Sequence, residues 1–247
     1  MAIFAVLAFA VFAALGTWQV VRLLWKLALI ERVEQRVHAA PVPAPGPESW
    51  SQLSAESDEY RRVRLVGIYE YDKTTRVQAV TDLGSGYWLM TPLRTVEGSV
   101  VLVNRGFIPL GQGDAGSEAG QRAGTAEVTG LLRMSQPGGA FLRKNDPAAG
   151  RWYSRDVEAI AAAQGAGSVA PYFVDADAAS AERDARQAPP PAPVGGLTVV
   201  SFHNNHLVYA LTWYALALMT AGAFYWVARH ERLRAGTDRE DADGRNN

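Results

Sequence analysis

The sequence predicts a membrane protein of the α + β class, in which a two-helix transmembrane hairpin carries a mainly antiparallel β domain, either an open sheet or barrel-like. Two observations support this prediction. Each end of the chain contains an uncharged apolar run, at about residues 2–21 and 207–227, long enough to cross the ~30 Å hydrocarbon core of a bilayer as a helix. The region between these runs consists of short stretches of alternating apolar and polar residues, separated by turn signals.

The first helix is expected within residues 1–40, crossing the membrane at about 2–21 and continuing as a helical extension. A cleaved signal peptide fits less well, because no basic residues precede the apolar run and because the helical pattern continues beyond it. Small residues would let this helix pack closely on the last span, unless they face lipid. They are Ala10, Ala13, Ala14 and Gly16, opposite Ala210, Ala217 and Ala221.

An aromatic and basic stripe follows the first span along one helical face. Trp18, Arg22 and Trp25 lie on this face, with Lys26 beside them. Such a stripe usually anchors a helix at the membrane interface, where aromatic rings and the heads of long cationic side chains reach water. The alternative is a cationic collar that binds anionic groups such as carboxylates or lipid phosphates. The residues alone are compatible with both interpretations.

A proline-rich linker is expected at residues 41–59, because closely spaced prolines end the helix and stiffen the chain. A mainly β domain is expected at residues 60–202. Its predicted strands are 60–71, 74–80, 86–96, 99–110 and 126–134, with shorter candidates at 172–175 and 197–202.

Within this domain, one amphipathic helix is predicted at residues 155–164, with Asp156 in its first turn. Two stretches are expected to form mobile loops, residues 111–124 and 179–196. The first is rich in glycine, and the second is charged and then rich in proline. Neither can bury enough apolar surface to offset the entropy lost on ordering.

The second transmembrane helix is expected at residues 203–228, followed by a polar tail at 229–247 that is expected to be disordered beyond Arg234. His206 lies at the start of this helix, on the face that also carries Trp213. An ionisable residue at a membrane boundary is a candidate functional residue. The alternative is that His206 only anchors the helix at the interface.

Composition excludes several classes of function. The net charge of −1 provides no basic excess for binding nucleic acid. The absence of cysteine excludes disulfides, thiolate metal sites and cysteine nucleophiles. Nothing resembles a phosphate-binding loop, a dinucleotide fingerprint or a nucleophile elbow. The histidines all flank the spans, so we expect no enzyme active site in the middle domain; they are His38, His203, His206 and His230.

The charge pattern does not determine the membrane orientation. Two spans place both termini on one side and the middle domain on the other. Basic residues follow both spans in equal number, and long domains cross membranes largely regardless of charge. They are Arg22, Lys26, Arg32 and Arg36 after the first span, and Arg229, Arg232, Arg234 and Arg239 after the second.

Four stretches resemble the Surfeit locus protein 1 family, membrane factors that assist the assembly of cytochrome c oxidase. They are LGTWQVVRLLWKLALIERVEQR, GSGYWLMTPL, VVLVNRGFIP and NNHLVYALTWYALAL, in the order of the family and over nearly the whole chain. The most specific part of the resemblance is a pair of motifs. Gly-x-Trp-Gln lies at the end of the first span, and Asn-His-Leu-x-Tyr-Ala-x-Thr-Trp lies at the start of the second.

The resemblance implies a middle domain in the periplasm or the mitochondrial intermembrane space, with both termini on the inner side. The first span begins almost at residue 1, without a transit peptide, so the expected location is a bacterial inner membrane with cytoplasmic termini. The few basic residues that family members carry before this span are missing here.

The resemblance further implies binding of haem a and help with its insertion into subunit I of the oxidase, with haem a synthase as a second partner in the bilayer. His206 matches the histidine that the family associates with haem, and neutral imidazole is a common axial ligand of haem iron. The ring would pack against Trp213, Tyr209 and Trp18. The propionates would be neutralised by Arg22 or Lys26.

The residues also allow other interpretations. His203, one turn from His206, could supply a second ligand, but one helix face does not easily bring both nitrogens to one iron, so it is expected to be a bystander. A scaffold that stabilises subunit I without binding haem is the main alternative. An extracytoplasmic sensor fits less well because only a short tail follows the second span. A copper carrier fits less well because the chain has no cysteine.

Overall fold

The computed structural model describes the backbone of residues 2–111, 124–138, 143–186, 192–198 and 204–243. The chain divides into two compact units. One contains Met1–Glu31 and Ser201–Asn247, and the other contains Arg32–Val200.

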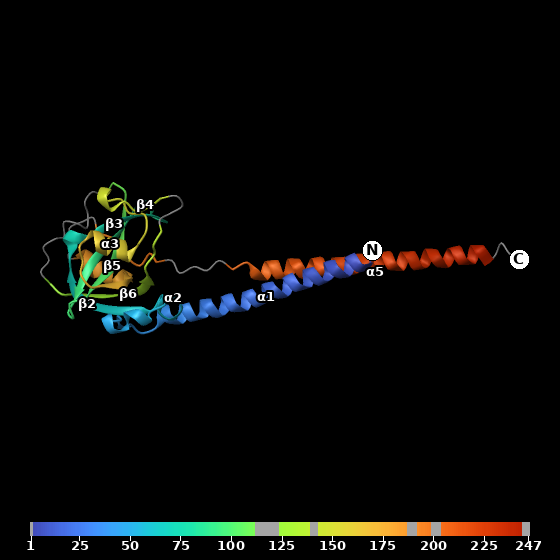
Figure 1. Ribbon diagram of the computed structural model, residues 1–247, viewed down its shortest axis with the longest axis horizontal. Helices are drawn as coiled ribbons and strands as arrows, with labels where there is room; N and C mark the ends of the chain where they lie inside the picture. Colours follow the sequence, from blue (N-terminus) through green and yellow to red (C-terminus); the bar gives the residue numbers. More distant parts are fainter. Residues whose placement is uncertain (1, 112–123, 139–142, 187–191, 199–203, 244–247) are drawn as a thin grey trace. The chain divides into compact units, whose positions relative to one another are not determined.

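The helical unit is built from the first part of α1 (Ala2–His38) and from α5 (His206–Asp243), which run side by side in opposite directions (Figure 1). By length and composition, α1 and the segment His206–Arg232 are both apolar enough to cross a membrane. The two expected apolar helices are therefore confirmed. The expectation of a disordered tail beyond Arg234 is wrong, because α5 continues to Asp243. No proline interrupts the tail, and each residue added to a helix gains a backbone hydrogen bond.

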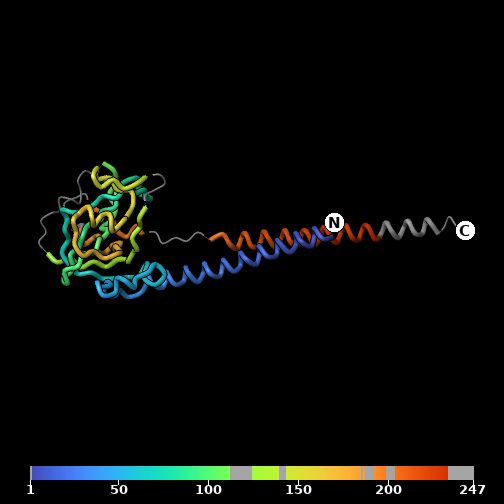
Figure 2. Tube along the Cα trace, in the orientation of Figure 1, coloured from blue at the N-terminus to red at the C-terminus, as the bar shows by residue number. Residues whose placement is uncertain are grey.

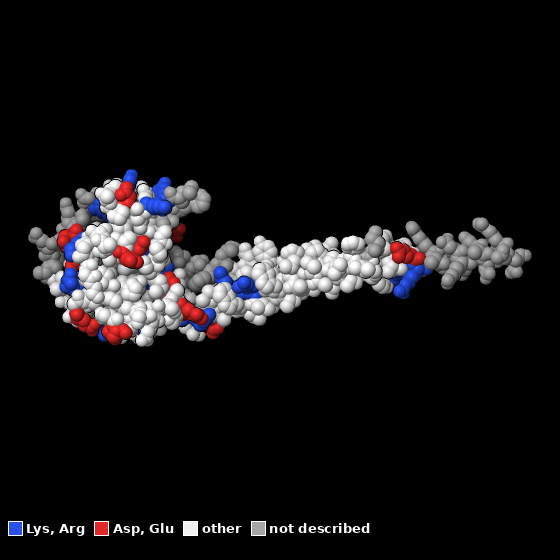
Figure 3. Space-filling model, viewed as in Figure 1, with Lys and Arg blue, Asp and Glu red and all other residues white. Residues whose placement is uncertain are grey.

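Small residues lie where the two helices approach each other. Gly16, Ala210 and Ala217 are buried. A Cβ atom at Gly16 would lie 2.8 Å from Cε1 of Tyr214, so only glycine fits there without moving the tyrosine ring. Ala14 is exposed and does not take part. No charged residue occurs from residue 2 to 21 or from 207 to 228, and Figure 3 shows the corresponding surface without acidic or basic side chains.

The second unit is the compact part of the trace in Figure 2. It is a β domain with a seven-stranded sheet. Its strands are β1 (Val42–Pro43), β2 (Arg62–Tyr69), β3 (Thr75–Thr81), β4 (Gly84–Thr95), β5 (Val100–Pro109), β6 (Ala126–Met134) and β7 (Val169–Ala176). Their order in the sheet is β1-β2-β6-β7-β5-β4-β3, with an additional pairing between β2 and β4. This pairing closes β2, β6, β7, β5 and β4 into a ring, so the domain is barrel-like.

The sheet is mixed rather than uniformly antiparallel. The strand β7 lies between β6 and β5, antiparallel to the former and parallel to the latter. The short β1 is also parallel to β2. A parallel neighbour requires a long crossover connection, which here contains β6 and the helix α3 (Val157–Ala163). Alternation along a strand indicates which face is buried, and it does not indicate the direction of the neighbouring strand.

The predicted strands agree well with the observed ones. The five longer predictions correspond to β2 through β6, and the candidate at 172–175 corresponds to the longer β7. The candidate at 197–202 is not a strand at residues 197 and 198, and its remainder lies outside the described residues. The predicted helix is α3, where Asp156 Oδ1 accepts a hydrogen bond from the N–H of Ala159 at 3.1 Å. This is the N-terminal cap expected of aspartate.

Two expectations about irregular segments need correction. The linker at 41–59 contains β1, the 3₁₀ helix η1 (Pro47–Gln52) and α2 (Ala55–Asp58). The carbonyl of Pro45 accepts hydrogen bonds from Trp50 Nε1 at 3.0 Å and from the Tyr172 hydroxyl at 2.8 Å, which joins the linker to the domain. The expected loop at 179–196 begins as a helix, α4 (Ala178–Arg186). The expected loop at 111–124 falls mostly outside the described residues.

The core has two parts on opposite faces of the sheet. One contains Val101 and Val103, together with residues from β2, β4, β6 and β7. The other contains Leu102 and Phe173, together with Ile160 of α3. The strand β5 is thus buried on both faces, which explains its nearly continuous apolar run. The short 3₁₀ turns η2 (Tyr71–Lys73) and η3 (Pro147–Ala149) complete the described elements.

Candidate functional site

Two asparagines determine where α5 begins, and thereby where His206 lies. The side-chain Oδ1 of Asn204 accepts a hydrogen bond from the N–H of His206 at 3.3 Å. The carbonyl of Asn205 accepts the N–H of Tyr209 at 3.2 Å. Asparagine side chains readily satisfy the free N–H groups of a first helical turn. His206 is therefore the first residue of α5, half-buried at one end of the apolar stretch.

The imidazole of His206 contacts the first helix directly. Its Nδ1 lies 2.7 Å from Oε1 of Gln19, within hydrogen-bonding distance. This contact joins residues that are 187 positions apart in the sequence. Sequence reasoning overlooked Gln19, although a polar side chain within an apolar helix is itself a signal of a buried partner.

Aromatic contacts continue the interface along the helix pair. The rings of Phe12 and Trp213 stack with centroids 5.8 Å apart and planes 25° from parallel. Next to this stack, Thr17 Oγ1 of α1 lies 3.0 Å from the hydroxyl of Tyr214, the residue that follows Trp213 on α5. Gln19 follows Phe12 by two turns of α1, and Trp213 follows His206 by two turns of α5. The contact between Gln19 and His206 and the stack of Phe12 on Trp213 therefore fit the same antiparallel alignment of α1 and α5.

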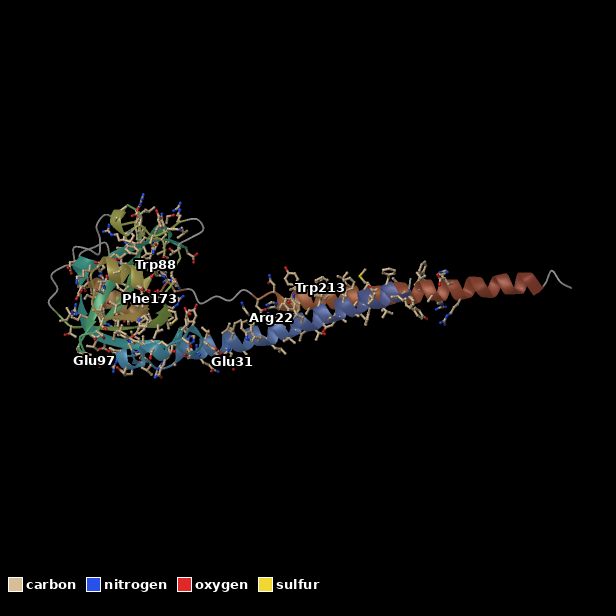
Figure 4. All side chains as sticks on the ribbon, viewed as in Figure 1. Arg22, Glu31, Trp88, Glu97, Phe173 and Trp213 are labelled. Atoms are coloured by element: carbon tan, nitrogen blue, oxygen red, sulfur yellow. The ribbon has the colours of Figure 1, made fainter. Side chains whose placement is uncertain are left out.

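The other candidate residues for ring packing differ in their surroundings. Trp213, labelled in Figure 4, lies in the helix interface. Trp18 is 51% exposed and Tyr209 is 54% exposed. The guanidinium carbon of Arg22 lies 5.6 Å from the centroid of the Trp18 ring, within the range of a cation–π contact. Lys26 is half-buried one turn further along α1. The structure thus brings Gln19 to His206 and Arg22 to Trp18, and His203 lies outside the described residues.

The donor set at this site is a single imidazole nitrogen. Within the described part of the chain, no three His, Cys, Asp or Glu side chains converge as metal ligands. Exposed aromatic rings and one guanidinium lie on the adjoining helix turns. One nitrogen ligand, apolar ring surfaces and a cation are the groups that a flat apolar macrocycle with anionic edge groups needs. The residues present therefore fit a haem.

A second cluster of polar residues, which the sequence did not predict, lies inside the β domain around Asp175. Its Oδ1 accepts hydrogen bonds from Asn104 Nδ2 at 2.8 Å and from Arg155 Nη1 at 3.1 Å. Its Oδ2 accepts one from Arg133 Nη1 at 3.0 Å. Burial lowers the pKa of Arg155, and Asp175 offsets this only in part. For Arg133, burial also acts to lower the pKa, but Asp175, Tyr60 and Glu59 outweigh it and raise the pKa.

A third cluster holds α4 against the barrel. Asp184 of α4 accepts hydrogen bonds from Arg105 Nε at 2.7 Å and from the hydroxyl of Tyr71 at 2.9 Å. The Arg105 side chain is almost fully buried, and its guanidinium carbon lies 4.6 Å from the centroid of the Tyr71 ring. Burial raises the pKa of the neighbouring Tyr69, and the negative charge of Asp184 raises it further. This cluster explains why the segment after residue 178 is a docked helix.

These features define a class of protein with two apolar helices, one before and one after a barrel-like β domain in the sequence. The two helices are joined by a hydrogen bond between the side chains of Gln19 and His206. The chain belongs to the SURF1 family, whose model matches residues 6–218. It is 34% identical to Surfeit locus protein 1 of Mus musculus over 235 residues, which cover 88% of this chain and 72% of the mouse protein. Surfeit locus protein 1 of Homo sapiens is 34% identical over 240 residues, covering 90% and 75%. A SURF1-like protein of Monosiga brevicollis is 31% identical over 238 residues, covering 90% and 85%.

Proposed function

We propose that this chain is a membrane assembly factor for a haem–copper terminal oxidase, cytochrome c oxidase, and that it binds haem a and assists its insertion into subunit I. Membership of the SURF1 family supports the assembly role. One observation supports haem binding above the others. A half-buried imidazole lies at the end of an apolar helix pair, with one ring nitrogen paired to Gln19.

In this proposal, haem a is a cargo. His206 ligates the iron, and Trp213, Tyr209 and Trp18 contact the ring. Arg22 and Lys26 neutralise the propionates, as charge-assisted hydrogen bonds to carboxylates do elsewhere. A single protein ligand suits a carrier that must release what it binds, because a second strong ligand would slow the release.

We further propose that the protein lies in a bacterial inner membrane, with both termini in the cytoplasm and the β domain in the periplasm. Arginine far outnumbers lysine in a chain rich in alanine and glycine, which favours a bacterial source. Large apolar side chains are exposed along the described parts of α1 and α5, for example Leu7 and Leu218. In the bilayer they would meet lipid, subunit I and haem a synthase.

A haem-free scaffold is the second candidate function. The contact between Gln19 and His206 favours it to some extent, because an interhelical hydrogen bond can hold two membrane helices together without any ligand. A scaffold of this kind would bind subunit I through its helices and stabilise an assembly intermediate. His206 would then matter for the stability of the protein and not for haem.

The visible absorption spectrum separates these two functions. The full chain would be purified in detergent from cells that make haem a, together with His206→Ala. The carrier predicts haem a bands in the wild type that are lost in the variant, with the variant still folded by circular dichroism.

His230→Ala is the matched histidine control. His230 also lies on α5, but it follows the opposite end of the apolar stretch from His206, and its ring packs against Trp226 with centroids 4.5 Å apart. This variant should retain the bands. A colourless wild type, or equal bands in His206→Ala, would contradict haem binding at His206 and favour the scaffold.

A further inference from the structure

We propose that Gln19 is the positioning residue for His206, because it selects the tautomer in which Nδ1 carries the proton and Nε2 carries the free lone pair. This inference deepens the proposed function. Its statement that Nε2 is the atom that faces the haem iron rests on that proposed function. The tautomer itself does not depend on haem. It is a property of the protein alone and can be measured without ligand.

The chemistry of the two side chains carries the first step. An amide oxygen only accepts hydrogen bonds, and in neutral imidazole one nitrogen donates while the other accepts. The partner of His206 Nδ1 is Oε1 of Gln19, at 2.7 Å. The proton must therefore lie on Nδ1. The lone pair is left on Nε2, so Nε2 is the nitrogen that can ligate a metal.

The surroundings explain why this contact persists. An unpaired polar group is costly in an apolar membrane environment, so both side chains gain from the bond. The stack of Phe12 on Trp213 and the close approach of Gly16 to the Tyr214 ring hold the two helices in register. With the helix register held in this way, Gln19 faces His206 and not lipid.

Metal-binding histidines in general donate their second ring N–H to a neighbouring acceptor, which orients the ring and increases the basicity of the ligating nitrogen. Loss of such an acceptor typically weakens metal binding by about 10–100-fold. Gln19 occupies the place of this acceptor. Orienting the His206 ring is a different role from joining the two helices, and the variants below separate these two roles.

Three variants of the full chain make the test. Gln19→Met keeps the size of the side chain and removes the acceptor. Gln19→Glu keeps an acceptor at the same distance along the side chain. Thr17→Val removes the neighbouring interhelical hydrogen bond with Tyr214 and leaves Gln19 intact.

The first measurement uses ¹⁵N-histidine NMR on the haem-free protein in detergent, above the pH at which the imidazole titrates, with His206→Ala to assign the signal. The expected result is a protonated Nδ1 in the wild type, in Gln19→Glu and in Thr17→Val. Gln19→Met should shift to the Nε2-protonated form that is common in free histidine. A wild-type ring protonated on Nε2, or a tautomer unchanged in Gln19→Met, would overturn the inference.

The second measurement is titration with haem, followed by absorption. Gln19→Met should bind about 10–100-fold more weakly than the wild type, with Gln19→Glu and Thr17→Val close to the wild type. Equal binding by Gln19→Met would show that Gln19 does not position the ligand. A wild type with the expected tautomer and no haem binding would instead contradict the proposed function while leaving the role of Gln19 in the tautomer intact.

Discussion

At the scale of single residues, the β domain depends on buried charges that are paired one by one. Asp175 is 3% exposed and receives hydrogen bonds from two arginines and an asparagine. Removing one partner of a buried ion pair lowers the free energy of unfolding by more than the intact pair contributes to it, because the remaining buried charge is left without compensation.

Substituting Asp175→Asn should therefore destabilise the domain severely. Arg133 and Arg155 would keep their buried charges and lose the shared carboxylate, at a cost of about 3–5 kcal/mol in the free energy of unfolding. Chemical denaturation of the full chain in detergent, followed by tryptophan fluorescence, measures this loss. Asp146→Asn is the control, because its ion pair with Arg151 is at the surface, and it should leave the midpoint nearly unchanged. Equal midpoints for both variants would contradict the prediction.

The carboxylate of Glu70 should make the stability of the fold depend on pH. Burial acts to raise its pKa, but the hydrogen bonds and charges of Lys73 and Arg94 outweigh burial and lower the pKa below the ordinary value of 4.5. A carboxyl group with a lowered pKa in the folded state stabilises the fold above its unfolded pKa, and this stability is lost as the pH falls toward the folded value.

The free energy of unfolding should thus decline as the pH falls below about 4.5, and less steeply in Glu70→Gln than in the wild type. Denaturation midpoints measured from pH 7 down to pH 3 test this. Glu97→Gln is a suitable control, since Glu97 lies exposed at the turn between β4 and β5. A wild type and a Glu70→Gln variant with the same pH profile would exclude the assigned role of Glu70.

At the scale of elements, close packing of α1 on α5 depends on Gly16. A side chain at this position would meet the ring of Tyr214. Helix pairs in membranes associate mainly through such close contacts of small residues.

Gly16→Leu should push the helices apart and break the contact between Gln19 and His206, although neither residue is changed. The expected result is loss of the Nδ1-protonated form of His206 in the NMR measurement described above. Ala14→Leu, on an exposed face of the same helix, should leave the tautomer as in the wild type. An unchanged tautomer in Gly16→Leu would argue against this packing.

The carboxylate of Asp184 is one of the contacts that hold the helix α4 in place, together with the bond between Ser180 and Thr129. Asp184→Asn should leave Arg105 buried with a weakened partner, so α4 should detach more often from the barrel. Hydrogen exchange measured by mass spectrometry should show faster exchange in the peptide that covers residues 178–186. Arg186→Ala removes only an exposed pair with Glu182 and should not change the rate. Equal exchange in both variants would mean that Asp184 does not hold the helix.

At the scale of the whole molecule, the proposed orientation places the β domain and the two termini on opposite sides of the membrane. The absence of cysteine makes this testable with single introduced cysteines. Val96→Cys labels the turn between β4 and β5, where the side chain is 77% exposed, and Arg232→Cys labels the other side. A membrane-impermeant maleimide applied to spheroplasts should modify Val96→Cys at once and Arg232→Cys only after permeabilisation. The reverse pattern would contradict the orientation.

The sequence by itself determined the features that depend on local pattern. Uncharged runs of the right length indicate the two apolar helices, and period-two alternation indicates β2 through β6 to within a few residues. The helix α3 was predicted from its local pattern with Asp156 in the first turn, and the structure places Asp156 just before that turn, as its N-terminal cap. His206 was singled out as an ionisable residue beside an apolar run, and its role in haem binding stays a prediction.

Only the tertiary structure decided the contacts between residues far apart in the chain. The parallel pairing of β5 with β7, the docking of α4 through Arg105, and the bond between Gln19 and His206 all belong to this group. No local pattern encodes them, because a side chain's own periodicity specifies which face it occupies but not which distant residue will meet it there. In this protein the distant residue is Gln19, and it decides which nitrogen of His206 is free to bind.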